Sequence, residues 1–322
     1  MMEQTQEPIT PLPKLYNDFL ERGRTGRNEW WRYLLGFLIV SAFYVLGQFP
    51  FGVAAMDGAM KNGHSIVDIS TNQEKLLDPT YTGLDANFQL VLELLIFVSA
   101  MFGLWIVVRF LHKKPFTSII TSATKIRWKR FFISFCLWFA FGFIGQFVSM
   151  AMYPDAFQMV FNLKPFLITL LIGMLMLPIQ TWFEEFFFRG YLMQGLGLIF
   201  KKAIFPVLIT GSMFALVHMS NPEVKAYGVL TMLPAYLLPG IFFALFASLD
   251  EGLESVMGIH FANNLFGTIG VTTSASAIQA STIWSASKMF PSSDNLSLLI
   301  ELLIMLLILM KINKWKFDKL YR

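Results

Sequence analysis

Cysteine and charge are both scarce in this 322-residue sequence. Its single cysteine, Cys136, excludes a disulfide framework and any zinc site built from several cysteines. Only 14% of the residues are charged, whereas a soluble domain usually has about 25%. A short apolar core of the signal-peptide type is also missing from residues 1–30, which are polar and contain three prolines. We therefore expect neither a secreted disulfide-rich domain nor a cleaved leader.

Apolar residues take the place of the missing charge. Hydrophobic residues make up 55% of the chain, with 34 Phe and 18 Met, and the mean hydropathy is +0.57. A helix needs about 20 apolar residues to cross the hydrocarbon core of a bilayer. The qualifying runs are roughly 32–55, 88–110, 131–153, 165–188, 203–220, 229–249, 252–270 and 296–312. The sequence predicts an all-α fold, a polytopic membrane helix bundle of about eight transmembrane helices. The fifth and seventh runs are short, and two prolines, Pro234 and Pro239, interrupt the sixth.

Charge patterning divides the chain into four parts and orients it. Residues 1–30 form a cytoplasmic or interfacial segment with a short helix over 14–30, and residues 31–160 hold three transmembrane helices. Residues 161–275 form a core that carries the polar motifs, and residues 276–322 hold an outer loop, a last helix and a basic tail. The basic segments all fall on one side when there are eight spans. By the positive-inside rule, both termini are cytoplasmic and loops 57–86 and 271–295 face outward.

A few ionisable side chains lie inside these apolar runs. Each costs roughly 2.5–3.5 kcal/mol on insertion scales and by default marks a functional site. They are Glu93, Glu184, Glu185, Arg189, His218 and His260, with Asn263 and Asn264 beside the last. The other two histidines, His64 and His112, fall in polar segments, and we expect both at the surface.

Three of these charges share one helix, in the segment LMLPIQTWFEEFFFRGYL (175–192). Glu185 and Arg189 are four residues apart, so they share a helical face and can form an ion pair. Glu184 lies about 100° around the helix and is less accessible to Arg189. Either all three form one structural ion network, or Glu184 is left free to do chemistry. Glycines 190, 195 and 197 indicate a loosened helix end after the motif.

The other polar residues inside the apolar runs could act together with Glu184. They are His218, His260 and Asn264. One glutamate and two histidines can hold a catalytic zinc ion and leave a fourth position for water. The same residue types can also activate water without a metal, with the glutamate as base. Asn264 shares a helical face with His260 and could stabilise an oxyanion. The structural alternative is that both histidines are hydrogen-bonded core residues without a catalytic role.

Three motifs occur in order on successive hydrophobic runs: EEFFFR (184–189), FALVH (214–218) and HFANN (260–264). They have the forms EExxxR, FxxxH and HxxxN, and over about residues 165–270 the chain resembles the CPBP intramembrane proteases. That family includes CAAX prenyl proteases and bacterial Abi-like proteins linked to bacteriocin processing or immunity.

The resemblance implies an intramembrane endopeptidase that acts on a membrane-associated or lipidated peptide or protein. Glu184 would activate water with His218 as its partner, and His260 with Asn264 would stabilise the oxyanion. Glu185 and Arg189 take the supporting positions. The family name, metalloprotease, implies zinc held by Glu184, His218 and His260. The expected partners are membrane lipid and a peptide substrate, without nucleic acid.

Two other functions are compatible with the same residues. Carboxylate and histidine relays also occur in proton-coupled transporters, but the inverted repeats typical of many such folds are not visible. A non-catalytic family member could act in bacteriocin immunity or in the regulation of a sensor. The short loops and compact length favour a protein of the bacterial plasma membrane.

Overall fold

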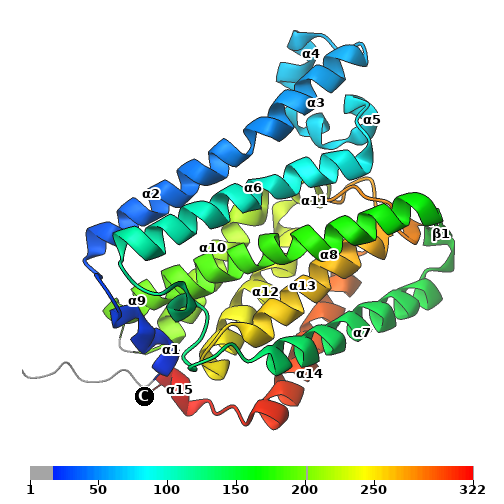
Figure 1. The fold of residues 1–322 in the computed structure, drawn as a ribbon. Coiled ribbons are helices and arrows are strands. Elements are labelled where there is room, and N and C mark those ends of the chain that lie inside the picture. Colours follow the sequence, from blue (N-terminus) through cyan, green and yellow to red (C-terminus); the bar gives the residue numbers. More distant parts are fainter. Residues whose placement is uncertain (1–16, 201, 322) are drawn as a thin grey trace, which may run out of the picture.

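The computed structural model of the protein describes residues 17–200 and 202–321, which form a bundle of long helices (Figure 1). The first half contains α1 (Asp18–Glu21), α2 (Trp30–Gly47), α3 (Phe49–Lys61), α4 (Ile66–Thr71), α5 (Pro79–Thr82), α6 (Ala86–Ile106) and α7 (Trp128–Met152). The second half contains α8 (Leu163–Glu185), α9 (Met193–Ile199), α10 (Ile204–Val217), α11 (Pro222–Tyr227), α12 (Val229–Asp250), α13 (Glu254–Ile269), α14 (Pro291–Asn313) and α15 (Asp318–Tyr321).

Six helical segments in the described part of the chain are long and apolar enough to cross a membrane. They are Trp30–Lys61, Ala86–Leu111, Trp128–Met152, Leu163–Ile199, Val229–Asp250 and Pro291–Asn313. The fifth and seventh expected spans form α10 and α13, of 14 and 16 residues. At 1.5 Å per residue these helices reach only about 21 and 24 Å, less than the roughly 30 Å of hydrocarbon. The predicted all-α polytopic bundle is confirmed, with two of its helices short.

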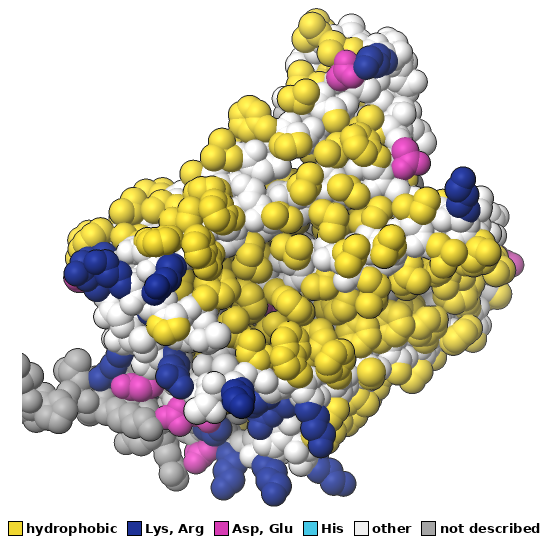
Figure 2. All heavy atoms as spheres, in the orientation of Figure 1, with side chains coloured by type: hydrophobic (Ala, Val, Ile, Leu, Met, Phe, Trp, Pro, Cys, Tyr) yellow, Lys and Arg dark blue, Asp and Glu magenta, His cyan; other side chains and the backbone are white. Residues whose placement is uncertain are grey.

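Apolar side chains form a broad band across the face of the bundle seen in Figure 2. Examples exposed by 55–67% are Leu34, Leu38, Leu171, Leu175 and Leu307. A water-soluble monomer rarely exposes a continuous apolar surface of this extent. Lys and Arg side chains gather at the lower end of the same view, which we call the basic end (Figure 2), and helix α7 begins at this end (Figure 1). Helices α2 and α3 run as a rod past the rest of the bundle and carry α4 and α5 at the opposite end (Figure 1).

Several local predictions were wrong. The N-terminal helix expected over 14–30 is only the one-turn α1 and a 3₁₀ turn over Arg22–Arg24, and positions 14–16 lie outside the described residues. Helix α12 runs without interruption through Pro234 and Pro239, because neighbouring groups in membrane helices compensate for the lost hydrogen bonds.

Three strands were not predicted. β1 (Phe157–Met159) pairs antiparallel with β3 (Trp284–Ala286), and β3 pairs parallel with β2 (Val271–Thr272). Segments this short have no readable alternation of side chains.

Ion pairs between partly exposed arginines and fully buried carboxylates stabilise the basic end of the bundle. Arg127 at the start of α7 contacts Glu254, the first residue of α13, with an Nη2–Oε2 distance of 2.5 Å. Arg130 pairs with Asp250 at the end of α12, and the indole Nε1 of Trp315 donates to the same carboxylate at 2.7 Å. The start of α13, and with it the depth of the residues further along that helix, is therefore fixed against α7 and α12.

His112 is fully buried, in contrast to its predicted place at the surface. Its Nδ1 donates to the Arg27 carbonyl oxygen at 2.7 Å, and its Nε2 accepts from the Tyr191 hydroxyl at 3.0 Å. Burial lowers the pKa of His112 to about 4, so the ring is neutral near pH 7. The imidazole thus connects the N-terminal segment to the helix that follows the EExxxR motif.

Candidate active site

Helix α8 carries the EExxxR motif and is continued by a π-helical segment over Phe186–Leu192. π-Helical turns occur frequently at functional sites, where they shift side chains relative to the preceding helix. The backbone stays helical through Gly190, Gly195 and Gly197 as far as Ile199, so these glycines do not mark the predicted loosened end. Gly190 instead allows close packing, since a Cβ there would collide with the Ile119 carbonyl oxygen.

Glu185 and Arg189 form the predicted ion pair. Arg189 Nη1 lies 3.1 Å from Glu185 Oε1, and both side chains are fully buried. The guanidinium also donates from Nη2 to the Gly240 carbonyl oxygen at 3.2 Å, and it lies 4.2 Å from the centre of the Phe214 ring. These contacts join α8 to α10 and α12, so Arg189 has a supporting position at the centre of the bundle.

His260 of α13 lies between the two glutamates. Its Nδ1 is 2.7 Å from Glu185 Oε1, and its Nε2 is 3.5 Å from Glu184 Oε2. A bond from Nδ1–H to the Glu185 carboxylate fixes the plane of the imidazole and directs Nε2 towards Glu184. The structure therefore brings together three predicted residues from two helices that are far apart in sequence.

Glu184 is buried but only half satisfied. Its Oε1 accepts a hydrogen bond from Gln180 Nε2 at 3.3 Å, whereas Oε2 has no hydrogen-bond partner among the described residues. Gln180 Oε1 in turn accepts from Asn264 Nδ2 at 3.1 Å. Because an unsatisfied buried carboxylate oxygen is costly, its presence here requires an explanation, such as a water or a reacting group.

His218 occupies a separate position at the end of α10. Its Nδ1 donates to the Phe214 carbonyl oxygen at 2.7 Å, and its ring stacks on Tyr236 with centroids 4.9 Å apart. The Phe214 ring contacts both histidines, at 4.4 Å from His218 and 6.0 Å from His260. No hydrogen bond between His218 and either glutamate is found in the described part of the chain.

A catalytic zinc site needs three protein ligands within about 2.0–2.3 Å of a common point. Within residues 17–200 and 202–321, no three His, Cys, Asp or Glu side chains are arranged to hold a metal ion. Glu184, His218 and His260, on which the sequence predicts zinc, therefore do not form a ready zinc site in this conformation.

Sequence reasoning missed Gln180, which joins Glu184 to Asn264. Its signal was present, because a polar residue four positions before Glu184 in an apolar helix lies on the same face. Asn263 Nδ2 donates to Asn264 Oδ1 at 3.1 Å, and Trp138 Nε1 donates to Asn263 Oδ1 at 3.3 Å, which extends the network to α7. Glu93 lies elsewhere, on α6, where it accepts from Gln89 at 2.9 Å.

Comparison with known proteins shows the family of this chain. A family model described as type II CAAX prenyl endopeptidase Rce1-like matches residues 164–266, which run from α8 to α13 and include all three motifs. The chain is also similar to the uncharacterized protein YyaK of Bacillus subtilis (strain 168), with 32% identity over 257 residues. That match covers 80% of this chain and 82% of the relative. No solved structure matches significantly. The chain is an integral membrane protein that belongs to the CPBP family of CAAX-type intramembrane endopeptidases.

Proposed function

We propose that this protein hydrolyses a peptide bond in a membrane-associated peptide or protein, with Glu184 as the base that activates water. The carrying observation is the free Oε2 of Glu184, which is buried and faces His260 Nε2 at 3.5 Å. That separation is long for a direct hydrogen bond but too short for a water between the two atoms, so the water of the proposed reaction would lie beside them, within reach of both. There it would contact a carboxylate able to take its proton.

The contacts of the cluster support distinct roles for the two glutamates. Glu185 Oε1 lies within hydrogen-bond distance of both Arg189 Nη1 and His260 Nδ1, whereas Glu184 Oε2 faces His260 Nε2. Glu185 and Arg189 then position the histidine, while Glu184 is the residue that reacts.

In the proposed reaction, Glu184 takes a proton from water as the oxygen attacks the substrate carbonyl. The resulting oxyanion accepts hydrogen bonds from His260 Nε2–H and from Asn264 Nδ2, which turns from Gln180. Glu184 returns its proton to the leaving amine as the C–N bond breaks. His218, whose ring stacks on Tyr236, has no hydrogen-bond partner at Nε2 among the described residues, so it is available to a substrate group.

The protein's place in the cell is part of this proposal. Lys and Arg gather at the basic end, which we assign to the cytoplasm by the positive-inside rule. The similarity to a Bacillus subtilis protein favours a bacterial plasma membrane. We propose that the termini and the starts of α7 and α13 face the cytoplasm. A membrane-impermeant thiol reagent applied to intact cells tests this, because a cysteine placed at position 319 should be protected and one at position 67 labelled.

The test of the reaction is the Glu184→Gln variant, which keeps the shape of the side chain and removes the base. Wild type and variant are reconstituted in liposomes and assayed on C-terminal peptides with and without a farnesyl group. The termini of membrane proteins from cells expressing each form are mapped in parallel. We expect at least a 100-fold loss of cleavage with an unchanged Tm, whereas Glu93→Gln, which alters a membrane carboxylate elsewhere, should keep activity. Full activity of Glu184→Gln would refute the assignment of the base.

A further inference from the structure

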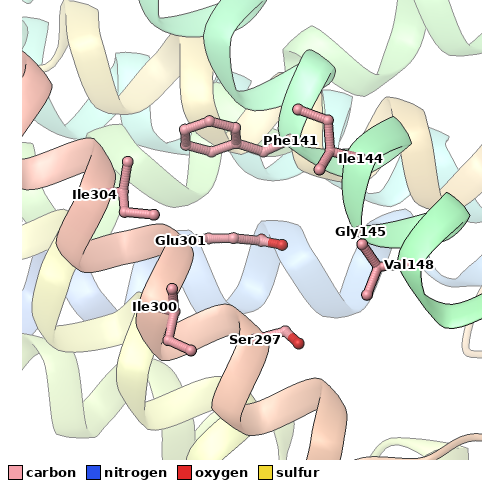
Figure 3. A pocket seen from close by; sticks show the side chains of 8 residues that line it. All are labelled: Phe141, Ile144, Gly145, Val148, Ser297, Ile300, Glu301 and Ile304. Atoms are coloured by element: carbon pink, nitrogen blue, oxygen red, sulfur yellow. The ribbon is translucent and has the colours of Figure 1, made fainter. Parts of the chain in front are cut away.

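A cleft of about 340 Å³ lies between α7 and α14 (Figure 3), and no residue of the catalytic cluster lines it. Its lining residues are Phe141, Ile144, Gly145 and Val148 from α7 and Ser297, Ile300, Glu301 and Ile304 from α14. Ile144 and Ile300 are 59% and 48% exposed on the apolar surface of the bundle, so the cleft opens towards lipid. It is an apolar groove with one ionisable side chain.

Glu301 is that side chain. It was not recognised from the sequence, where it is a single charge among many apolar residues of the last run. It extends from α14 towards α7 (Figure 3), where a Cβ on Gly145 would lie 3.1 Å from its Oε1. The absence of a side chain at Gly145 thus leaves room for the carboxylate. Among the described residues Glu301 has neither a hydrogen-bond nor an ion-pair partner. Intramembrane carboxylates normally pair with another group, and this one faces an open cleft.

The size of the cleft limits what can occupy it. A volume of 340 Å³ equals the space of on the order of ten water molecules, at about 30 Å³ each. This accommodates one or two long side chains and is too small for a helix. A lysine or arginine side chain combines an apolar stem, which suits the isoleucine and phenylalanine walls, with a cation that can pair with Glu301.

A chain of contacts leads from this cleft to the catalytic network. The Phe141 ring lies 6.1 Å from that of Trp138, whose indole donates to Asn263, which donates to Asn264. Gly145 is seven residues beyond Trp138, about 10 Å along the axis of α7. An extended peptide covers that distance with about three residues, so a peptide held in the cleft can extend to the level of Trp138, where the network begins.

We propose that this cleft binds a lysine or arginine side chain from the membrane-embedded part of the protein substrate, through an ion pair with Glu301. The proposal rests on the proposed function, since it treats the occupant as a substrate. The pairing would give a membrane-embedded basic residue a partner and hold the neighbouring peptide beside α13. Selection would then depend on a residue several positions from the bond that is cut.

Binding to the full-length Glu184→Gln variant in lipid nanodiscs tests this separately from hydrolysis. The probes are two dye-labelled membrane-spanning peptides of leucine and alanine, identical except for lysine or norleucine at the centre. We expect at least tenfold tighter binding of the lysine peptide. Glu301→Gln should abolish this preference, and Gly145→Leu, which fills the cleft, should weaken it. Glu93→Gln is the matched control, because it removes a membrane carboxylate that has a partner elsewhere, and it should keep the preference.

Three results would overturn the proposal. Equal affinity for the two peptides would show that the cleft does not select a cation. Equal losses in Glu301→Gln and Glu93→Gln would show a general attraction between membrane charges. A preference that disappears when the discs contain phosphatidylethanolamine would assign the cleft to a lipid amine. If the lysine preference is present but Glu184→Gln still cleaves, the proposed base is wrong and the basic-residue site stands.

Discussion

The buried pair of Glu185 and Arg189 allows a quantitative prediction. With 3.1 Å between Oε1 and Nη1, the pair attracts by roughly 5 kcal/mol at an effective dielectric constant of about 20. Arg189→Met keeps most of the side-chain volume but leaves the Glu185 carboxylate, which is fully buried, without its cation. Breaking such a pair by removing one partner costs about 3–5 kcal/mol. At about 2–4 °C per kcal/mol, the Tm should fall on the order of 10 °C.

The double variant Glu185→Gln with Arg189→Met separates the ion pair from simple packing. It removes both charges, so no carboxylate is left uncompensated, and we expect it to recover more than half of the lost Tm. Cleavage should stay low in the double variant, because His260 has lost the carboxylate that orients its Nδ1. The assay is thermal unfolding in detergent, with peptide cleavage measured on the same samples. The reasoning is refuted if Arg189→Met lowers stability by less than about 1 kcal/mol, or if the two substitutions destabilise additively.

Three further predictions concern packing, pH and metal. A Cβ at Gly211 would lie 2.8 Å from the Ile241 backbone, so Gly211→Val should destabilise by about 1–3 kcal/mol, whereas Gly267→Ala, which has open space, should not lower the Tm. Burial holds the pKa of His112 at about 4, below its ordinary 6.5. The contribution of the neutral His112 ring to the free energy of unfolding is therefore complete above pH 6.5 and is lost as the pH falls towards 4. His112→Phe should remove up to about 3 kcal/mol of the change in unfolding free energy between pH 6.5 and 4, which flattens that part of the pH–Tm profile. An unchanged profile would contradict the linkage. Cleavage should persist in 1,10-phenanthroline because the three expected ligands do not converge, and one tightly held zinc per chain would argue against this reading.

The helical spacing of charges predicted the local parts of the site correctly. Residues four apart on one helix must share a face, and Glu185 and Arg189 do form their ion pair. Helical spacing also predicted that Glu184 does not pair with Arg189, as is observed among the described residues. It could not indicate that Glu185 also binds His260, because that contact joins residues 75 positions apart. It also could not show that His218 would bond to its own helix backbone rather than to Glu184.

Two other residues, His112 and Glu301, were misjudged from the sequence for the same reason. His112 was expected at the surface because its neighbours are polar, yet the packing of the N-terminal segment over it buries it completely. Glu301 was overlooked among many apolar residues. Only the structure shows that it lies beside Gly145, on a helix more than 150 positions earlier. In both cases the environment of a titratable group is supplied by residues distant in sequence.

The sequence by itself determined that the protein lies in a membrane and that its long apolar segments are helices. Long apolar runs with few charges must be helices in a bilayer, since no other local structure satisfies the backbone there. The three motifs and the resemblance they carry were also readable without coordinates. Only the tertiary structure decided which donor meets which acceptor: His260 between two glutamates, Gln180 as a bridge, His218 set apart, and a carboxylate facing an open cleft. The physical reason is that hydrogen bonds and ion pairs act over a few ångströms, and distances between helices are fixed by packing rather than by spacing along the chain.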